Sequence, residues 1–337
     1  MKAIGYTTAG NIDRNDALLD LELPLPQPGA HDLRVKVAAV SVNPVDTKLR
    51  KSRPASADAP EVLGYDAVGV VDAIGTAVTE FAVGDRVYYA GAINRPGSNA
   101  EFQLVDARIT GRAPANLSDA EAAALPLTAI TAWEMLFDRL GVQQNGGQGQ
   151  HLLVIGAAGG VGSIMIQLAR QLTGLTIIAT ASRSETQDWC RELGAHHVID
   201  HSQPMAAQLQ ALGITGVEYT AVLTHSHEHW AAIAEVTAPQ GKIGLIDDPA
   251  SPLDIMLLKR KAISLHWEMM FTRSLFQTPD MAEQGVLLTR VAELAEAGKI
   301  RSTLAQTFSP INAANLRAAH ALLESNKVRG KVVLSGF

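Results

Sequence analysis

Residues 154–170, VIGAAGGVGSIMIQLAR, decide the fold of this chain. The stretch ends an apolar run that begins at residue 151, passes through a cluster of small residues, and continues into a segment whose apolar residues recur at helical spacing. These recurring residues are Val161, Ile164, Met165, Leu168 and Leu172. The order predicts a buried strand, a tight turn and an amphipathic helix that buries one face.

The turn reads AAGGVG over residues 157–162, an A-x-G-x-x-G variant of the dinucleotide-binding fingerprint. In that fingerprint the middle glycine lets the backbone approach a pyrophosphate, and the last lets the helix pack closely on the strand. The phosphate then binds the free N–H groups of the helix. The pattern predicts cofactor contacts at Ala158, Gly159, Gly160, Val161 and Gly162. The alternative is a plain loop that joins a strand to a helix.

Apolar runs alternate with helical patterns through the second half of the chain. We predict strands over residues 151–157, 175–181, 196–200, 218–225, 242–247 and 263–270. Strands that alternate with helices form right-handed βαβ units and a parallel sheet covered on both faces. The expected fold class is therefore α/β, with a doubly wound parallel sheet of the Rossmann type.

The two ends of the chain have a different pattern of predicted strands and helices. Short strands broken by Gly, Pro and Asp are predicted over residues 33–42, 62–71, 85–91 and 101–106, where helix signals are weak. This pattern favours a β-barrel-like domain. Near the C-terminus we expect helices at about residues 280–298 and 312–325, followed by a short strand, KVVL.

Bulk properties exclude several classes of protein. A length of 337 residues favours two domains. The net charge of −6, without a Lys/Arg cluster, argues against a nucleic-acid surface. No apolar run is long enough to cross a membrane, and no signal peptide is apparent, so a cytoplasmic location is expected. The single cysteine, Cys190, excludes an internal disulfide and a thiolate-rich zinc site.

The end of the second predicted strand indicates which nicotinamide cofactor binds. NAD sites usually carry Asp or Glu about 20 residues after the glycine turn, where this chain has Ser182 and Arg183. A guanidinium can pair with a 2′-phosphate, whereas an acid would repel it. We therefore expect NADPH. The alternative is that Arg183 is only a solvated charge.

Several segments together resemble the medium-chain dehydrogenase/reductase superfamily: SVNPVDTKLR (41–50), VLGYDAVGVV (62–71), VGDRVYY (83–89), ALPLTAITAW (124–133), GAAGGVG (156–162) and HWEMMFTR (266–273). Within it the chain is similar to the quinone oxidoreductase branch, and specifically to the bacterial "zinc-type alcohol dehydrogenase-like" group. The resemblance implies a GroES-like catalytic domain, residues 1–122 and 271–337, around an inserted Rossmann NADP-binding domain, residues 123–270. It also implies an active site in the cleft between them and a homodimer formed through the last Rossmann strand.

The resemblance also locates the positions that hold a catalytic zinc in the alcohol dehydrogenases of the superfamily. Their Cys, His and Cys ligands fall on Asn43, Tyr65 and Leu127, none of which is a zinc ligand of usual strength. We therefore expect no metal, and Asn43 and Tyr65 become the candidate catalytic hydrogen-bond donors. The alternatives are an Asx-turn at Asn43, ahead of Pro44, and a buried core phenol at Tyr65.

Three further features bear on the site. Thr131 matches a residue near the nicotinamide in the family, and so does the loop at His225. His225, His227 and His229 alternate after the fourth predicted strand, where imidazoles can bind zinc, so a metal there is the competing interpretation. Lys48 stands where quinone oxidoreductases of this branch often have tyrosine, which weakens any transfer of their substrates.

Without a Lewis acid, alcohol oxidation is disfavoured, while hydride addition to an electron-poor carbon needs only hydrogen-bond donors. The leading hypothesis is an NADPH-dependent oxidoreductase that reduces quinones or α,β-unsaturated carbonyls, which are small-molecule substrates, by direct hydride transfer. The alternatives are an alcohol dehydrogenase with an unusual metal site in the histidine cluster, and a non-catalytic NADPH-binding sensor.

Overall fold

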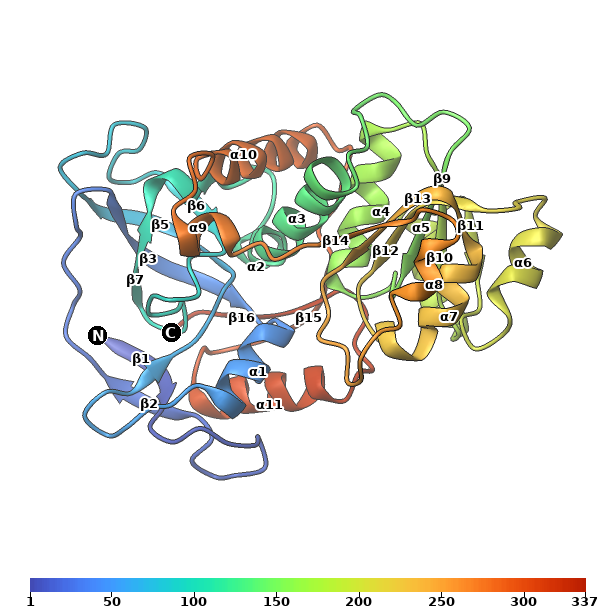
Figure 1. Cartoon of the computed structure of the whole chain (residues 1–337). Coiled ribbons are helices and arrows are strands. Elements are labelled where there is room, and N and C mark those ends of the chain that lie inside the picture. The colour runs from blue at the N-terminus through green and yellow to red at the C-terminus, as the bar shows by residue number, and fades with distance from the viewer. The chain divides into compact units, whose positions relative to one another are not determined.

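The computed structural model describes every residue, Met1–Phe337, and the chain divides into two compact units (Figure 1). Unit 1 contains Met1–Ile130 and Phe271–Phe337, and unit 2 contains Thr131–Met270. Unit 1 is therefore built from both ends of the chain. None of the helices combines the length and the apolar character that a membrane crossing requires.

Unit 2 contains a six-stranded sheet in which every neighbouring pair is parallel. Its strands are β9 (His151–Ile155), β10 (Thr176–Thr180), β11 (His197–Ile199), β12 (Val217–Val222), β13 (Thr237–Leu245) and β14 (Ser264–Trp267). Their order is β11-β10-β9-β12-β13-β14, so the strand order reverses between β9 and β12. Ligands of doubly wound sheets bind at the carboxyl ends of the strands where this reversal occurs. The predicted fold class is confirmed.

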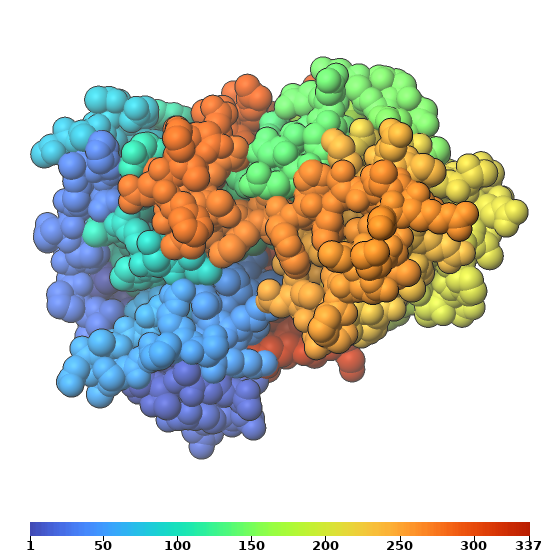
Figure 2. All heavy atoms as spheres, in the orientation of Figure 1, coloured from blue at the N-terminus to red at the C-terminus, as the bar shows by residue number.

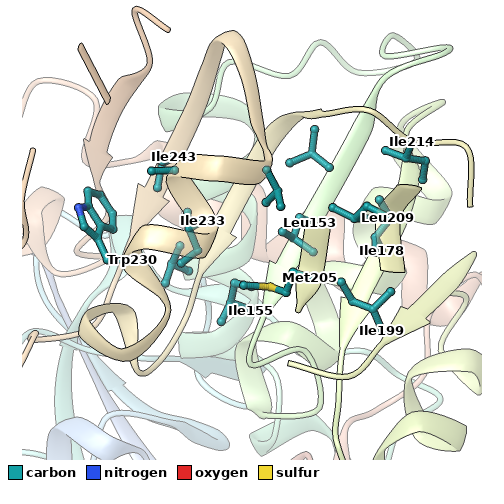
Figure 3. Close-up of a cluster of buried hydrophobic side chains, with 14 of the residues drawn as sticks. Leu153, Ile155, Ile178, Ile199, Met205, Leu209, Ile214, Trp230, Ile233 and Ile243 are labelled. Carbon is teal, nitrogen blue, oxygen red and sulfur yellow. The ribbon is translucent and has the colours of Figure 1, made fainter. Parts of the chain in front are cut away.

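Apolar side chains from the strands and from the helices α6 (Met205–Ala211), α7 (Ser226–Val236) and α8 (Met256–Lys259) of unit 2 form one buried cluster (Figure 3). Unit 2 also contains α4 (Gly160–Leu172) and α5 (Ser184–Glu192). Leu153 and Ile243 of the sheet belong to the same buried cluster as Met205 of α6 and Trp230 of α7. In α4, Ile164, Met165 and Leu168 of the predicted apolar stripe are buried, so the helical periodicity there reflects burial of one face.

Unit 1 contains a seven-stranded sheet and a three-stranded sheet. The larger sheet has the order β15 (Leu304–Phe308), β16 (Lys331–Ser335), β3 (Asp32–Ser41), β5 (Ala67–Ile74), β6 (Arg86–Tyr89), β8 (Gly111–Arg112), with β7 (Phe102–Asp106) also paired to β3. The smaller sheet has the order β2 (Leu19–Glu22), β1 (Lys2–Tyr6), β4 (Glu61–Val62). Because β16 pairs antiparallel with β3, strands from the two ends of the chain share one sheet.

The structure differs from the sequence analysis in two places near the candidate site residues Asn43 and Tyr65. The stretch predicted as one strand over residues 62–71 is split into β4 and β5, because Gly64 adopts a φ of +117° that interrupts the strand. Helix α1 (Pro44–Ser52) has no predicted counterpart. Proline at its first position and the Asp46 carboxylate, which accepts a hydrogen bond from the Asn43 backbone N–H (2.7 Å), start this helix.

The predicted helices near the C-terminus correspond to α10 (Glu283–Glu296) and α11 (Ala313–Glu324). The first unit boundary lies between Ile130 and Thr131 rather than at 122/123. The physical reason is α2 (Asp119–Ala123), which packs against β3, β5 and β16. The chain therefore leaves unit 1 only within α3 (Pro126–Trp133).

Candidate active site

The glycine turn of unit 2 lies at the carboxyl end of β9, against the ends of the neighbouring strands. Gly156 has a φ of +79°, and its N–H donates to Thr180 Oγ1 at the end of β10 (3.2 Å). A Cβ on Gly156 would lie 2.7 Å from Thr224 Cγ2, just after β12. The turn, the end of β10 and the end of β12 therefore meet at the reversal of strand order.

The two glycines of the fingerprint have different surroundings. A Cβ on Gly162 would lie 2.4 Å from the carbonyl oxygen of Ala157, so this residue allows α4 to start directly against the strand. A Cβ on Gly159 would meet only the carbonyl oxygen of Gly156, at 3.4 Å, so its outer face is open. The first-turn N–H groups of a helix have no intrahelical partners. The residues present fit a dinucleotide pyrophosphate at this turn.

Ser182 and Arg183 connect β10 to α5, on the neighbouring strand. Arg183 is the residue that precedes the first turn of α5, and its Nε lies 3.6 Å from Glu185 Oε1. Its side chain is 43% exposed. Helix α5 is anchored to α4 because Trp189 Nε1 donates to Ser163 Oγ (2.8 Å). Ser182 and Arg183 therefore precede a helix that is anchored to α4, and residue 182 is not an acid.

The three histidines after β12 do not form the strand-end arrangement that the sequence suggested. β12 ends at Val222, His225 adopts a left-handed φ of 51° before α7, and His227 and His229 lie in the first turn of that helix. Residues two apart on a helix do not face each other. His229 packs against the ring of His201 (5.5 Å between centroids), and no group of three His, Cys, Asp or Glu side chains is arranged to hold a metal ion.

Unit 1 contains a buried polar network at one end of α1. The Asn43 side chain donates through Nδ2 to Asp66 Oδ2 (2.8 Å), and Lys331 Nζ donates to Asn43 Oδ1 (2.5 Å) and to Asp66 Oδ2 (2.8 Å). The second oxygen of Asp66 accepts from the Leu127 backbone N–H (2.7 Å). All three side chains are at least 97% buried. Burial raises the pKa of Asp66, and the Lys331 ammonium opposes that shift.

Tyr65 lies in the loop between β4 and β5, next to Asp66 in sequence. Its hydroxyl oxygen accepts a hydrogen bond from Arg53 Nη1 (3.2 Å), and its ring packs edge-on against Phe271 (5.3 Å between centroids). The residue is buried. Burial raises the pKa of the phenol, so Tyr65 is protonated and can act as a hydrogen-bond donor.

Sequence analysis missed a pair of buried carboxyl groups in unit 2. Glu134, in a π-helical turn over Glu134–Arg139, and Glu268, after β14, are both almost fully buried. Arg139 Nε donates to Glu268 Oε2 (2.8 Å), and its Nη2 lies 3.7 Å from Glu134 Oε2. Burial, and then the charge of Glu134, raise the pKa of Glu268 to about 9. The sequence signal for this pair was an acid within an apolar run in both WEMLF (133–137) and WEMMF (267–271).

Thr131, which was predicted to lie near the nicotinamide, is buried in α3, one turn before Glu134.

Comparison with known proteins identifies the family. Models described as "Alcohol dehydrogenase GroES-like domain" and "Zinc-binding dehydrogenase" match residues 29–115 and 193–334. The chain is 40% identical over 337 residues to a zinc-type alcohol dehydrogenase-like protein of Staphylococcus aureus, covering 99% of this chain and 100% of that protein. The chain belongs to the medium-chain dehydrogenase/reductase superfamily. It is an oxidoreductase of that superfamily, as the sequence resemblance predicted.

Two other members show how far the similarity extends. A crystal structure of a proposed zinc-dependent alcohol dehydrogenase from Rhizobium etli matches with a TM-score of 0.96 and 58% identity, over 100% of this chain and 98% of that one. The chloroplastic NADPH-dependent alkenal/one oxidoreductase of Arabidopsis thaliana is 36% identical over 213 residues, which is 60% of this chain and 53% of that protein.

The zinc of the superfamily's alcohol dehydrogenases does not fit this member's residues. Of the three positions that match zinc ligands, the Asn43 side chain is hydrogen-bonded at both its oxygen and its nitrogen. Leu127 has an aliphatic side chain without a ligand atom, its backbone N–H donates to Asp66, and Tyr65 carries a phenol of raised pKa. The Lys331 ammonium already supplies the positive charge that Asp66 requires. Neither a thiolate nor an imidazole is present at these positions.

Proposed function

We propose that this protein is an NADPH-dependent oxidoreductase that reduces quinones or α,β-unsaturated carbonyls by direct hydride transfer, without a catalytic metal. The observation that carries the proposal is the hydrogen-bonded network of Asn43, Asp66 and Lys331, in which Asn43 is at a position that matches a zinc ligand of the superfamily. Alcohol oxidation needs a Lewis acid to acidify the alcohol, whereas hydride addition to an electron-poor carbon does not. The name of the Arabidopsis relative points to the same substrate class.

The residues of unit 2 that would hold the cofactor each have a distinct role. The α4 turn from Ala158 to Gly162 would bind the pyrophosphate, and Ser182 with Arg183 would accommodate the 2′-phosphate. Thr131 and His225 are the candidates for contacts near the nicotinamide. The reduced cofactor supplies the hydride. The relative named as NADPH-dependent supports NADPH over NADH.

Tyr65 is the candidate hydrogen-bond donor to the substrate. When hydride adds to the electron-poor carbon, a pair of electrons moves to the substrate oxygen, and a phenol O–H can stabilise the charge that develops there. Water then supplies the proton that completes the reduction. Asn43 has its amide engaged by Asp66 and Lys331, so its proposed contribution is to hold the network next to Tyr65.

The test is NADPH oxidation measured against a benzoquinone, an enone, an aldehyde and an alcohol with NADP⁺, with NADH in parallel. We expect turnover of the quinone or the enone, with NADPH preferred. Stoichiometric zinc in untagged protein together with alcohol oxidation would refute the metal-free proposal. Tight NADPH binding without any turnover would instead indicate a sensor.

A matched pair of variants tests the cofactor preference. Arg183→Gln should lower kcat/KM for NADPH about 10- to 100-fold and leave NADH unchanged, because charge-assisted hydrogen bonds contribute about 1.5–3 kcal/mol. Arg191→Gln is the control, since Arg191 is an exposed arginine of the same helix paired with Asp188. Equal effects of the two substitutions would contradict the role of Arg183.

The proposed homodimer rests on β14, which is an edge strand because only β13 pairs with it. Trp267 is 57% exposed, and Ile255 and Met256 are each 61% exposed. Figure 2 shows the orange segment that includes these residues at the visible surface. Unpaired edges and apolar side chains favour association of copies. Light scattering should give twice the chain mass, and Trp267→Asp should give monomers; a monomeric wild type would refute the dimer.

A further inference from the structure

Arg53 lies beside the candidate donor Tyr65, and hydrogen bonds hold its guanidinium in place. Its Nη1 donates to both Glu61 Oε1 (2.7 Å) and Tyr65 Oη (3.2 Å), and its Nη2 donates to the backbone oxygen of Ile93 (2.8 Å). The carboxylate and the carbonyl oxygen therefore hold the guanidinium on either side of the contact with the phenol.

The backbone of Arg53 is fixed as well. The residue follows the last turn of α1, and its N–H donates to the carbonyl oxygen of Leu49 (2.7 Å). Its own carbonyl oxygen accepts from the Tyr6 hydroxyl (3.1 Å). With both ends held, Arg53 has little freedom to leave Tyr65. Its side chain is 23% exposed, so this contact is shielded from most of the solvent.

This arrangement determines how the phenol can be used. A guanidinium only donates hydrogen bonds, so Arg53 occupies a lone pair of the Tyr65 oxygen and leaves the O–H hydrogen unused. The Tyr65 hydroxyl donates no hydrogen bond within the chain, although the Asp46 and Glu61 carboxyl groups lie close enough to raise its pKa. The edge-on packing of Phe271 fixes the ring itself. A buried hydroxyl with an unused hydrogen favours a ligand that brings an acceptor, such as a carbonyl or quinone oxygen.

We propose that Arg53 is a positioning residue for catalysis: it orients the Tyr65 hydroxyl so that its hydrogen is donated to the substrate oxygen on which negative charge develops. The inference rests on the proposed function. Because the arginine acts through the phenol, its effect should require the phenol oxygen.

A double-mutant cycle tests this dependence, with kcat/KM for a benzoquinone and for methyl vinyl ketone as the readout. We expect Tyr65→Phe to lower kcat/KM about 100-fold, as the loss of one oxyanion donor does in other enzymes. Arg53→Met should lower it about tenfold when Tyr65 is present and less than threefold in the Tyr65→Phe background. Arg53→Lys should restore part of the activity, since lysine can also donate to the phenol oxygen.

A control separates this role from a structural one. Arg95→Met removes another ion pair of unit 1, between Arg95 and Asp32 (2.8 Å), without touching Tyr65. It should leave kcat/KM unchanged, and urea unfolding of every variant would report any loss of stability. If the losses in kcat/KM from Arg53→Met and Tyr65→Phe are additive in the double variant, the positioning role is refuted while the proposed function still stands. A folded wild type that binds NADPH but reduces neither probe would refute the proposed function and, with it, this role.

Discussion

Protonation of His320 should destabilise the anchorage of α1, the helix that carries Asn43 before its first turn and Arg53 after its last. Arg50 of α1 donates through Nη1 to His320 Nδ1 (3.2 Å) and through Nη2 to Glu324 Oε1 (2.5 Å), both on α11. Arg50 and His320 are completely buried. An imidazole that accepts from a guanidinium must be neutral at that nitrogen.

The pH dependence follows from this geometry. Burial, and then the charge of Arg50, lower the pKa of His320 from 6.5 to about 3. The unfolded chain therefore takes up a proton at a pH where the folded chain does not, so stability is fully present above about pH 6.5 and is lost as the pH falls towards 3. One proton contributes about 1.4 kcal/mol per pH unit, so the loss between pH 6.5 and pH 4.5 is about 2 kcal/mol.

His320→Asn isolates this effect, because the asparagine oxygen can still accept from Arg50 but does not titrate. The variant should be less stable than the wild type at pH 7.5, since it leaves a small cavity. Urea unfolding at pH 7.5, 6.5, 5.5 and 4.5 should show the difference between wild type and variant shrinking by about 2 kcal/mol on acidification. Two parallel curves would refute the assignment of a neutral, buried His320.

Three further predictions concern the network, the carboxyl pair and the glycine turn. Lys331→Met leaves Asp66 buried without a counter-charge and should lower the free energy of unfolding, measured in urea, by about 3–5 kcal/mol. Adding Asp66→Asn to this variant should restore part of the loss. No loss in Lys331→Met would refute the network's stabilising role. Because the pKa of Glu268 is raised in the folded chain, its protonated form stabilises the protein at low pH, and this contribution is lost as the pH rises through about 9. Glu268→Gln should therefore flatten the fall in Tm between pH 6 and pH 10. An unchanged slope would contradict this. Gly162→Ala should lower Tm, whereas Gly159→Ala should leave Tm unchanged and weaken NADPH binding at least tenfold by calorimetry; the reverse result would show that the phosphate does not bind at this turn.

Much of unit 2 was predictable because its elements are defined by local periodicity. The glycine turn, the six strands and the absence of thiolates could all be recognised within short stretches of sequence. The strand predicted over residues 218–225 ends instead at Val222, and α7 begins at Ser226, so His225, His227 and His229 do not alternate along a strand. Alternation of polar residues over a few positions does not distinguish these two outcomes.

Unit 1 was harder to predict, because its contacts join distant parts of the chain. Helix α1 lacks a strong apolar stripe and is held instead by Arg50, which pairs with His320 from 270 residues away. Asn43 and Tyr65 were singled out from the sequence, but their hydrogen-bond partners Lys331 and Arg53 had no sequence signal. Only the folded chain shows that the Asn43 amide is engaged by Asp66 and Lys331 and that the Tyr65 hydroxyl accepts a hydrogen bond from Arg53.

By itself, the sequence determined the α/β class, the glycine turn between a strand and a helix, and the family, since these depend on residue spacing within single elements. The tertiary structure decided which charges are buried together. Lys331 is 265 residues from Asp66, and Glu268 is 129 residues from Arg139. Whether a buried group is stable in its charged form depends on the charges that lie next to it in space. The pairing of β16 with β3 is what brings Lys331 to Asn43 and Asp66.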